Sequence, residues 1–329
     1  MTVFLATFTP MLTLFLCIAA GFAASKAKIL PDFAGKTLAK LETWIFCPAL
    51  SFMTMVRYCT LDSLTAHATN IVLAAISIAI SLGIAIPLSR LFVKEKGVER
   101  GVYAYALAFA NSGYMGDPIV LALFGDSVLA YYKLFGLPIS LVIYTWGINA
   151  ITPKNKEKGA TLKRLLNAPT VAMLIGVAMG LLGLGEYLPH FLTSALDSFK
   201  NCMGPVAMLL AGITIAQYDF IGMLKKKKVY FATALRLVII PVVMVAALFG
   251  IKTLANSVLD ISIGNDALFL CFFATATPLG LNTIIFPEAY GGNPETGASM
   301  TMISHTLCVI SIPLMYALMV AIFGTPFIT

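Results

Sequence analysis

The chain has 329 residues, of which 59% are hydrophobic and 11% are charged, and its net charge is +7. Soluble domains carry about 25% charged residues, so this composition excludes a soluble globule, and apolar surface must face lipid. The apolar stretches are roughly 20 residues long and lack period-two alternation, which favours membrane-spanning helices over a barrel. The positive charge lies in short segments between these stretches and indicates membrane topology rather than nucleic-acid binding. The six cysteines lie singly, without metal or redox spacing, so we expect no metal and no cofactor.

We predict ten membrane-spanning helices separated by one long connection. The first five are Val3–Ala24, Ala34–Met55, Ala68–Phe92, Gly101–Phe124 and Val128–Ile151. The second five are Thr170–Gly185, Ala195–Ala216, Val229–Ile251, Asp266–Tyr290 and Gly297–Phe323. Lys26 is the first basic residue, so we expect the first helix to be retained rather than cleaved as a secretory signal. The expected organisation is therefore a first five-helix repeat at 1–151, a cytoplasmic linker at 152–169 and a second five-helix repeat at 170–329.

The distribution of lysine and arginine predicts the orientation. Most of them fall in four segments, 26–40, 90–100, 154–164 and 225–228, that share one side of the membrane. Few fall on the other side. These are Arg57, Lys200 and Lys252. Because basic loops stay in the cytoplasm, we expect a multi-pass protein of the cytoplasmic membrane, in contact with lipid, with both termini on the outer face.

An odd number of helices in each half predicts that the halves, if homologous, are inverted relative to each other. The second helix of each half contains a proline in mid-span, Pro48 and Pro205. The fourth helix of each half ends in a similar way, at residues 122–125 and 288–291. We therefore expect two inverted repeats.

The fourth and ninth helices are interrupted in mid-span. Residues 110–118 contain two glycines, an asparagine, an aspartate and a proline, and residues 275–282 contain a proline, a glycine and an asparagine. These residues oppose a continuous helix. Broken, polar backbone at membrane depth is tolerated only inside protein or beside a cavity, and two such breaks in corresponding positions indicate a transporter site. The alternative is that the prolines and glycines merely kink packed helices.

Each interruption creates a new helix N-terminus, near Pro118 and near Gly280. Unpaired amides and the positive end of the helix dipole suit a carboxylate there. We expect Asn111, Asn282 and backbone amides near Gly116 and Gly280 to hold it. The full set of candidate substrate-binding residues is Asn111, Gly113, Gly116, Asp117, Pro118, Pro278, Gly280 and Asn282.

Four motifs in order resemble one known family along the whole chain. The stretch Asn111-Ser-Gly-Tyr-Met-Gly-Asp-Pro118 is similar to the Asn-x-Gly-x-x-Gly-x-Pro signature of the auxin efflux carrier family. Residues 47–52 resemble the proline motif of its second helix, residues 235–241 its eighth helix, and residues 276–291 its ninth.

The resemblance implies a fold of two domains. Helices one, two, six and seven form a scaffold and dimer interface, and helices three to five and eight to ten form a mobile transport domain with crossed broken helices. Similar architecture occurs in bile-acid sodium symporters and sodium/proton antiporters. Bacterial members of the family are described as malate or malonate carriers, and plant members export auxin. The resemblance thus implies a homodimeric carrier of a small organic anion, which agrees with the helix-end argument.

One residue departs from the family pattern. Asp117 occupies a position where the family usually has an apolar residue. Its carboxylate either repels an anion, binds a proton or a cation for coupling, or caps the second half-helix with Pro118 in the first turn.

Other ionisable residues lie within the predicted spans, where they are costly and are functional candidates. Arg236 either pairs with a carboxylate or extends to the cytoplasmic headgroups. For Lys133 we favour the same snorkelling towards the outer surface. His305 is either a proton relay or, as we favour, a neutral hydrogen-bonded packing residue. Glu42, near a helix end, is expected at the interface.

The predicted function is secondary transport of a small organic anion by alternating access, of the elevator type that the resemblance implies. The substrate class is a carboxylate or dicarboxylate such as malate, malonate or an auxin-like acid. The first alternative is a sodium- or proton-coupled carrier, favoured by Asp117 and His305, and the second is a channel. The sequence lacks a paired-histidine metal site and a Gly-x-Ser-x-Gly elbow, so we do not expect an enzyme.

Overall fold

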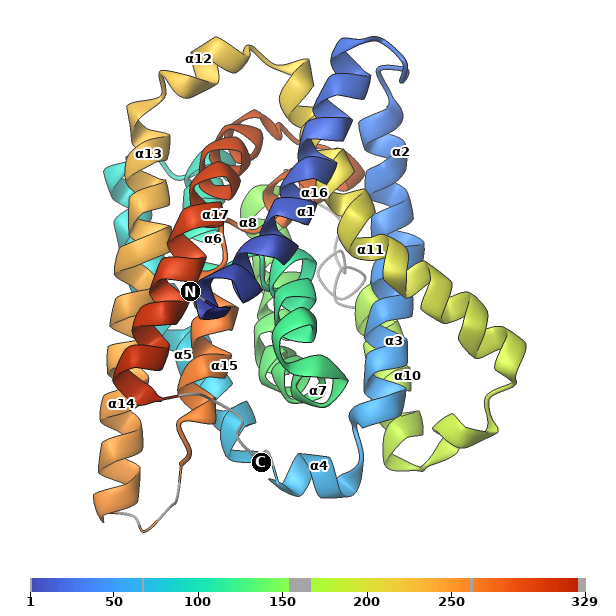
Figure 1. The fold of residues 1–329 in the computed structure, drawn as a ribbon. Helices are drawn as coiled ribbons and strands as arrows, with labels where there is room; N and C mark the ends of the chain where they lie inside the picture. The colour runs from blue at the N-terminus through green and yellow to red at the C-terminus, as the bar shows by residue number, and fades with distance from the viewer. Residues whose placement is uncertain (1, 67, 154–166, 259, 261–262, 325–329) are drawn as a thin grey trace.

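The computed structural model describes residues 2–66, 68–153, 167–258, 260 and 263–324, and this part of the chain is helical without any strand (Figure 1). Five of its helical segments are long and apolar enough to cross a membrane. They are Ala68–Leu91, Tyr131–Ile151, His190–Gln217, Lys227–Val258 and Glu295–Phe323. Shorter apolar helices lie at Met11–Lys26, Ala168–Leu181 and Asp266–Ala276. The prediction of an all-helical, multi-pass membrane protein is confirmed.

The described helices fall on both sides of the long connection, and α7 includes parts of the fourth and fifth predicted spans. The first half holds α1 (Thr2–Lys26), α2 (Ala34–Leu41), α3 (Cys47–Tyr58), α4 (Leu61–Ala66), α5 (Ala68–Leu88), α6 (Val98–Ala108), α7 (Asp117–Val142) and α8 (Ile148–Ile151). The second half holds α10 (Ala168–Leu181), α11 (His190–Gln217), α12 (Phe220–Leu224), α13 (Lys227–Ala234), α14 (Ile240–Val258), α15 (Asp266–Ala276), α16 (Asn282–Tyr290) and α17 (Glu295–Phe323). The short helices α4 and α12 lie between predicted spans. Most of the predicted linker falls on residues 154–166, outside the described residues.

Several predicted spans contain a π-helical turn, which sequence periodicity does not predict. In the described part of the chain these are η1 (Glu42–Phe46), η3 (Ser112–Gly116), η4 (Ile143–Gly147) and η6 (Leu235–Ile239). A π-turn inserts an extra residue into a helix and is frequent at functional sites. Here η3 lies within the first interruption, and η1 and η6 carry Glu42 and Arg236.

One group of helices is held together by close backbone contacts. Helix α1 packs along α11, and α3 packs along α10. A Cβ atom on Gly180 of α10 would come within 2.6 Å of the Met55 carbonyl oxygen of α3, so only glycine fits. Because lipid supplies no hydrophobic drive between helices, such small residues are what allow tight association.

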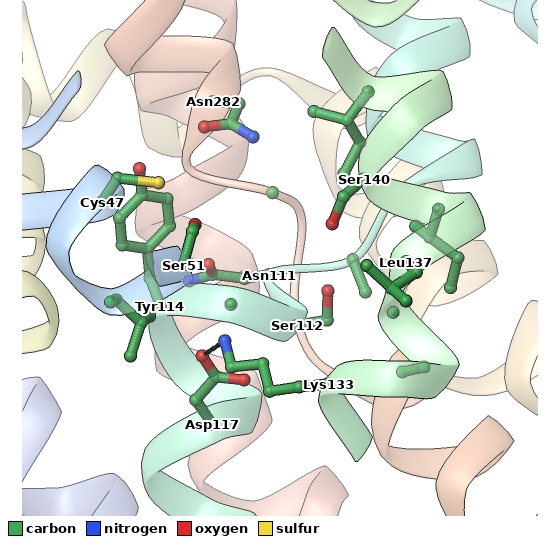
Figure 2. A pocket seen from close by; sticks show the side chains of 18 of the residues that line it. Cys47, Ser51, Asn111, Ser112, Tyr114, Asp117, Lys133, Leu137, Ser140 and Asn282 are labelled. Carbon is green, nitrogen blue, oxygen red and sulfur yellow. Dashed lines mark hydrogen bonds and ion pairs between the residues drawn. The ribbon is translucent and has the colours of Figure 1, made fainter. Parts of the chain in front are cut away.

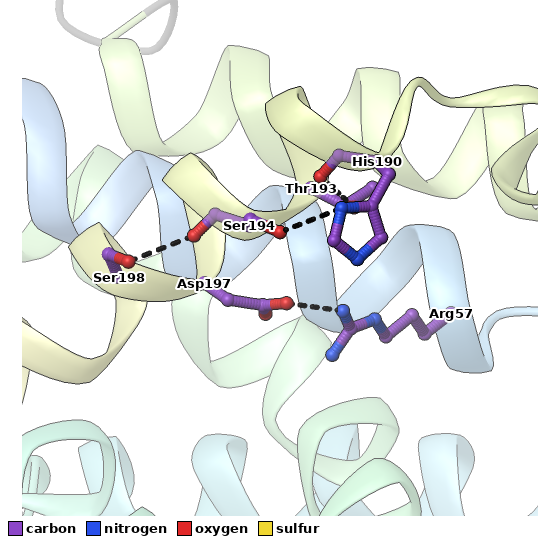
Figure 3. A network of polar contacts seen from close by, with 6 residues as sticks. All are labelled: Arg57, His190, Thr193, Ser194, Asp197 and Ser198. Atoms are coloured by element: carbon purple, nitrogen blue, oxygen red, sulfur yellow. Dashed lines mark hydrogen bonds and ion pairs between the residues drawn. The ribbon is translucent and has the colours of Figure 1, made fainter.

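A polar network joins α3 to α11 at one end of this group (Figure 3). The Arg57 Nη2 atom donates to Asp197 Oδ2 at 2.5 Å, and both side chains are partly exposed. On α11, the Ser194 hydroxyl lies 3.5 Å from His190 Nδ1. We assign this network to helix packing, since exposed ion pairs contribute at most about 1 kcal/mol.

The remaining long helices form a second group. Helix α5 packs on α6 and α7, α14 packs on α15, and α13 packs on α17. Figure 1 shows α13, α14 and α17 on one side of the molecule and α3 and α10 on the other, with α7 between them. The site lies where these two groups meet.

Candidate functional site

The first interruption follows directly from its sequence. Helix α6 ends at Ala108, and Phe109 is extended, with φ −114° and ψ 126°. The chain turns helical again at Ser112 as η3 and continues as α7 from Asp117. Gly113 and Gly116 are weak helix formers, and Pro118, in the first turn of α7, has no amide hydrogen to donate to the preceding turn. This half-helix ends at Gly125, whose φ of +80° turns the chain into the rest of α7.

The second interruption has the same plan. Helix α15 ends at Ala276, and Thr277 is extended, with ψ 156°. Pro278 enforces this, because the residue before a proline avoids the helical region. The helix restarts as α16 at Asn282 and ends at Tyr290, and the next residue, Gly291, has a φ of +83°.

The two interruptions lie in direct contact. Ala110 and Leu279 form an antiparallel bridge. The Asn111 amide donates to the Pro278 carbonyl at 2.8 Å, and the Gly280 amide donates to the Phe109 carbonyl at 3.3 Å. Unpaired backbone groups inside the protein would be costly, so each interruption satisfies the other.

This contact changes which amides a ligand can use. The amide of Gly280 is occupied by Phe109, and the amide of Gly116 donates to the Asn111 carbonyl at 3.1 Å. Neither of these two amides is therefore free, contrary to the simplest form of our expectation. The first-turn amides of η3, from Ser112 to Tyr114, are the ones that a helix start leaves without intrahelical partners.

A cavity of about 110 Å³ lies beside the crossing (Figure 2). One water molecule needs about 10–15 Å³ of such space, so the cavity has room for several waters or a small organic molecule. Both interruptions line it, and so do α3, α7, α10, α11 and η4. The polar side chains in its wall are Cys47, Ser51, Asn111, Ser112, Tyr114, Asp117, Tyr132, Lys133, Ser140, Tyr144 and Asn282.

Asn111 and His305 form a buried hydrogen bond, with 3.0 Å between Asn111 Nδ2 and His305 Nε2. The other ring nitrogen, Nδ1, lies 3.0 Å from the Thr301 carbonyl oxygen, which can only accept. Nδ1 therefore carries the proton, and Nε2 of a neutral ring accepts from Asn111. This arrangement agrees with the packing interpretation of His305. Asn111 keeps a second amide hydrogen, and its Oδ1 has no partner in the described residues.

Two tyrosines hold the interruptions in place. The Asn282 Nδ2 atom donates to the Tyr105 hydroxyl at 2.9 Å. The Tyr132 hydroxyl donates towards the Ser112 carbonyl at 3.3 Å and the Phe273 carbonyl at 3.2 Å, so it connects η3 to α15. A Cβ atom on Gly116 would overlap the Tyr132 hydroxyl, which explains the glycine.

Asp117 and Lys133 form an ion pair in the cavity wall. Figure 2 shows the Lys133 ammonium directed at the Asp117 carboxylate. Asp117 has helical dihedrals and is not an N-cap residue, so the capping interpretation is wrong. Lys133 is 17% exposed and does not snorkel, so that prediction is also wrong. Both residues lie eight positions from the turn at Gly125, which places them at the same depth in the helical hairpin.

Arg236 follows neither of the two interpretations that its sequence suggested. Its side chain is 0% exposed, and Nη1 donates to the Leu107 carbonyl at 2.8 Å. That carbonyl belongs to the last turn of α6, where the negative end of the helix dipole lies. Arg236 thus stabilises the C-terminal end of α6 and does not line the cavity.

Glu42 is not at an interface. It lies in η1, its side chain is 0% exposed, and neither carboxylate oxygen has a hydrogen-bond partner in the described residues. The expectation rested on its distance from the end of the helix. It failed because α10 and α11 pack against η1, the segment that carries Glu42.

The structure sorts the candidate residues into two sets. Those that line the cavity are Asn111, Gly113, Asp117, Gly280 and Asn282. Those outside its lining are Gly116, Pro118, Pro278, Arg236 and His305. Lys133 and Tyr132 were missed as site residues. The equal spacing of Asp117 and Lys133 about Gly125 is the sequence signal that would have found Lys133.

Comparison with known proteins agrees with this geometry. The family model described as membrane transport protein (Mem_trans) matches residues 6–316, nearly the whole chain. The search of curated proteins gave no match. The chain belongs to the membrane transport protein family, the family of the auxin efflux carriers.

Proposed function

We propose that this membrane transporter is a secondary carrier of a small organic anion, a carboxylate or dicarboxylate such as malate, malonate or an auxin-like acid. The observation that carries the proposal is the contact between the two interruptions, with the start of η3 and both Asn111 and Asn282 at one cavity. Helix starts and amide hydrogens favour a carboxylate. The cavity size suits a small acid.

The position of the cavity supports an elevator-type movement. One wall comes from α3, α10 and α11, and the opposite wall comes from the interruptions, α7 and η4. We propose that α1, α2, α3, α10 and α11 form the scaffold and that the other spans form the transport domain. Met55, Met173 and Met203 line the scaffold wall, and flexible methionines can repack as one surface slides past another.

We extend the proposal to the whole chain as ten spans in two inverted five-helix repeats, with both termini outside and the scaffold as a homodimer interface. Two features support the repeat. An asparagine stands at the helix start after each break, Asn111 just before η3 and Asn282 as the first residue of α16, and each half-helix ends at a glycine with φ near +80°. Inverted repeats place the substrate site at their interface, in mid-membrane.

The sodium- or proton-coupled carrier remains the second candidate. It is favoured by one observation, the presence of the Asp117 carboxylate in the wall of the cavity. Ionisable groups inside membranes mark ion and proton pathways in many transporters.

Uptake of radiolabelled malonate and malate into proteoliposomes tests the proposal. We expect saturable uptake with counterflow, which a channel does not give, and at least a tenfold loss in Asn111→Ala and in Asn282→Ala. Asn201→Ala is the matched control, because Asn201 is exposed on α11 and does not line the cavity. Normal rates in both cavity variants would show that the site is elsewhere.

A further inference from the structure

The Asp117–Lys133 pair has a charge balance that constrains what the cavity can bind. Among the described residues that line the cavity, these two are the charged ones. Asp117 is 8% exposed, and its Oδ2 accepts from Lys133 Nζ. In the empty cavity, the charges of these lining residues therefore cancel. An anion that entered this state would add an uncompensated negative charge in a poorly solvated place, which is unfavourable.

A proton on Asp117 removes this obstacle. The neutral carboxyl group no longer holds Lys133 by charge, and the lysine is then free to bind the carboxylate of the ligand. With a monocarboxylate, the site that holds Lys133 and the ligand again has no net charge, and a dicarboxylate leaves only its second carboxylate uncompensated. Two states therefore cross the low-dielectric barrier with the smallest free-energy cost. They are the empty site and the site that holds both a proton and an anion.

We propose that Asp117 is the proton-binding residue of this carrier and that Lys133 alternates between Asp117 and the carboxylate of the transported anion, so that each anion moves with one proton. The inference rests on the proposed function. It replaces a repulsive role for Asp117 with a coupling role.

The geometry of the hairpin supports this exchange. Asp117 begins α7 directly after η3, and Lys133 projects from the returning part of the same helix (Figure 2). Ser112 and Asn111 lie beside them in the same wall. A carboxylate held by Lys133 would therefore lie next to the helix start that favours it.

Other titratable groups surround the pair. Lys200 of α11 acts on Asp117 through its charge, and Arg236 acts on the neighbouring Tyr132. Several elements that pack against α7 also carry titratable groups. Within the described residues, these groups are Cys17 and Lys26 (α1), Cys47, Arg57 and Tyr58 (α3), Tyr114 (η3), Tyr144 (η4), and Asp266 and Cys271 (α15). Tyrosine and cysteine are ordinarily neutral near pH 7, and Arg57 is paired with Asp197. Among the described residues, Asp117 is the carboxylate that lines the cavity.

The test is uptake of radiolabelled malonate and malate into proteoliposomes whose membrane potential is clamped at zero. The external pH stays at 7, so that the ionisation of the acids does not change, and the internal pH is 7 or 8. With one proton per anion, a difference of one pH unit raises the final accumulation by about tenfold. A dye inside the vesicles should report proton entry with the anion.

The variants separate coupling from binding. Asp117→Asn is expected to keep counterflow exchange, which also shows that it folds and binds, and to accumulate equally at both internal pH values. Lys133→Met is expected to lose both uptake and counterflow. Glu42→Gln is the matched control, because Glu42 is a second buried carboxylate outside the cavity lining, and it should behave as the wild type.

The inference is overturned if Asp117→Asn still responds to the proton gradient, if Glu42→Gln loses the response, or if accumulation follows a sodium gradient. Saturable wild-type uptake without any effect of internal pH would overturn it too, while the proposed function would stand. Absence of saturable wild-type uptake of both acids would instead refute the proposed function.

Discussion

The two interruptions share a backbone plan but differ in their chemistry. Both consist of a half-helix, an extended residue and a second half-helix that ends at a glycine. The first is followed by a π-helical turn and carries the Asp117–Lys133 pair and the Asn111–His305 bond. The second carries no charged residue between Thr275 and Thr283, and its asparagine bonds to a tyrosine.

This difference separates two tasks. The backbone contact between the interruptions requires both of them, because each supplies hydrogen bonds that the other lacks. The ionisable chemistry lies at the first interruption. We infer that the second interruption mainly supports and shapes the site, and four comparisons test this view.

The largest effect is expected at the partners of the two asparagines. His305→Leu removes the bonds to Asn111 and the Thr301 carbonyl inside the protein, at about 1–3 kcal/mol for each group left unpaired. Tyr105→Phe removes one bond to Asn282, which is partly exposed to the cavity, and should cost about 1 kcal/mol. Thermal unfolding midpoints of the purified proteins measure both. Equal losses would contradict the distinction between the interruptions.

The glycines give the next comparison. Gly116→Ala places a Cβ atom against the Tyr132 hydroxyl, and the overpacking should cost about 1–3 kcal/mol and slow uptake. A Cβ atom on Gly280 would lie 3.4 Å from its nearest atoms. Gly280→Ala should therefore lower the free energy of unfolding by less than about 1 kcal/mol, within the range of tolerated core changes. Unfolding midpoints and malonate uptake are the measurements. A more severe defect in Gly280→Ala would reverse our assignment.

Tyr132→Phe sharpens the comparison, because this hydroxyl bridges η3 and α15. Its removal should lower stability by about 1 kcal/mol, the value of one net hydrogen bond. Combined with Gly116→Ala, the loss should be less than additive, since both changes affect the same contact. A double-mutant cycle on the unfolding midpoints checks this, and full additivity would argue against a shared contact.

The smallest effect is expected far from both interruptions, at the ion pair between Arg57 and Asp197. Both side chains are partly exposed, so Arg57→Ala should cost less than about 1 kcal/mol and the cost should shrink at high salt. Substrate uptake should not change. A large loss of uptake would mean that this scaffold network takes part in transport.

Part of the fold was predictable because its signals are local in the sequence. Apolar stretches of span length predict helices, and the clusters of glycine, proline and asparagine predict where two of these helices break. Asn111, Gly113, Asp117, Gly280 and Asn282 were predicted as candidate site residues for the same reason, and the structure places these five in the lining of the cavity. The π-helical turns were not predictable, because nothing in the local pattern of η1 or η6 opposes a continuous α-helix.

The partners of ionisable residues were predicted poorly. Lys133 and Arg236 were assigned from their depth along single helices, as if the surroundings were lipid and headgroups. In the structure the first faces Asp117 across a hairpin, and the second binds a carbonyl from another helix. Glu42 is buried in η1, against which α10 and α11 pack.

The sequence by itself determined that this protein lies in the membrane, that it is helical, and where two of its spans are interrupted, since lipid exposure and helix breaking depend on residue type and local order. Tertiary structure decided that the two interruptions touch, that Asp117 meets Lys133, and that Asn111 meets His305. These contacts join residues far apart along the chain, and a charge or amide inside a membrane takes whichever partner packing brings within reach.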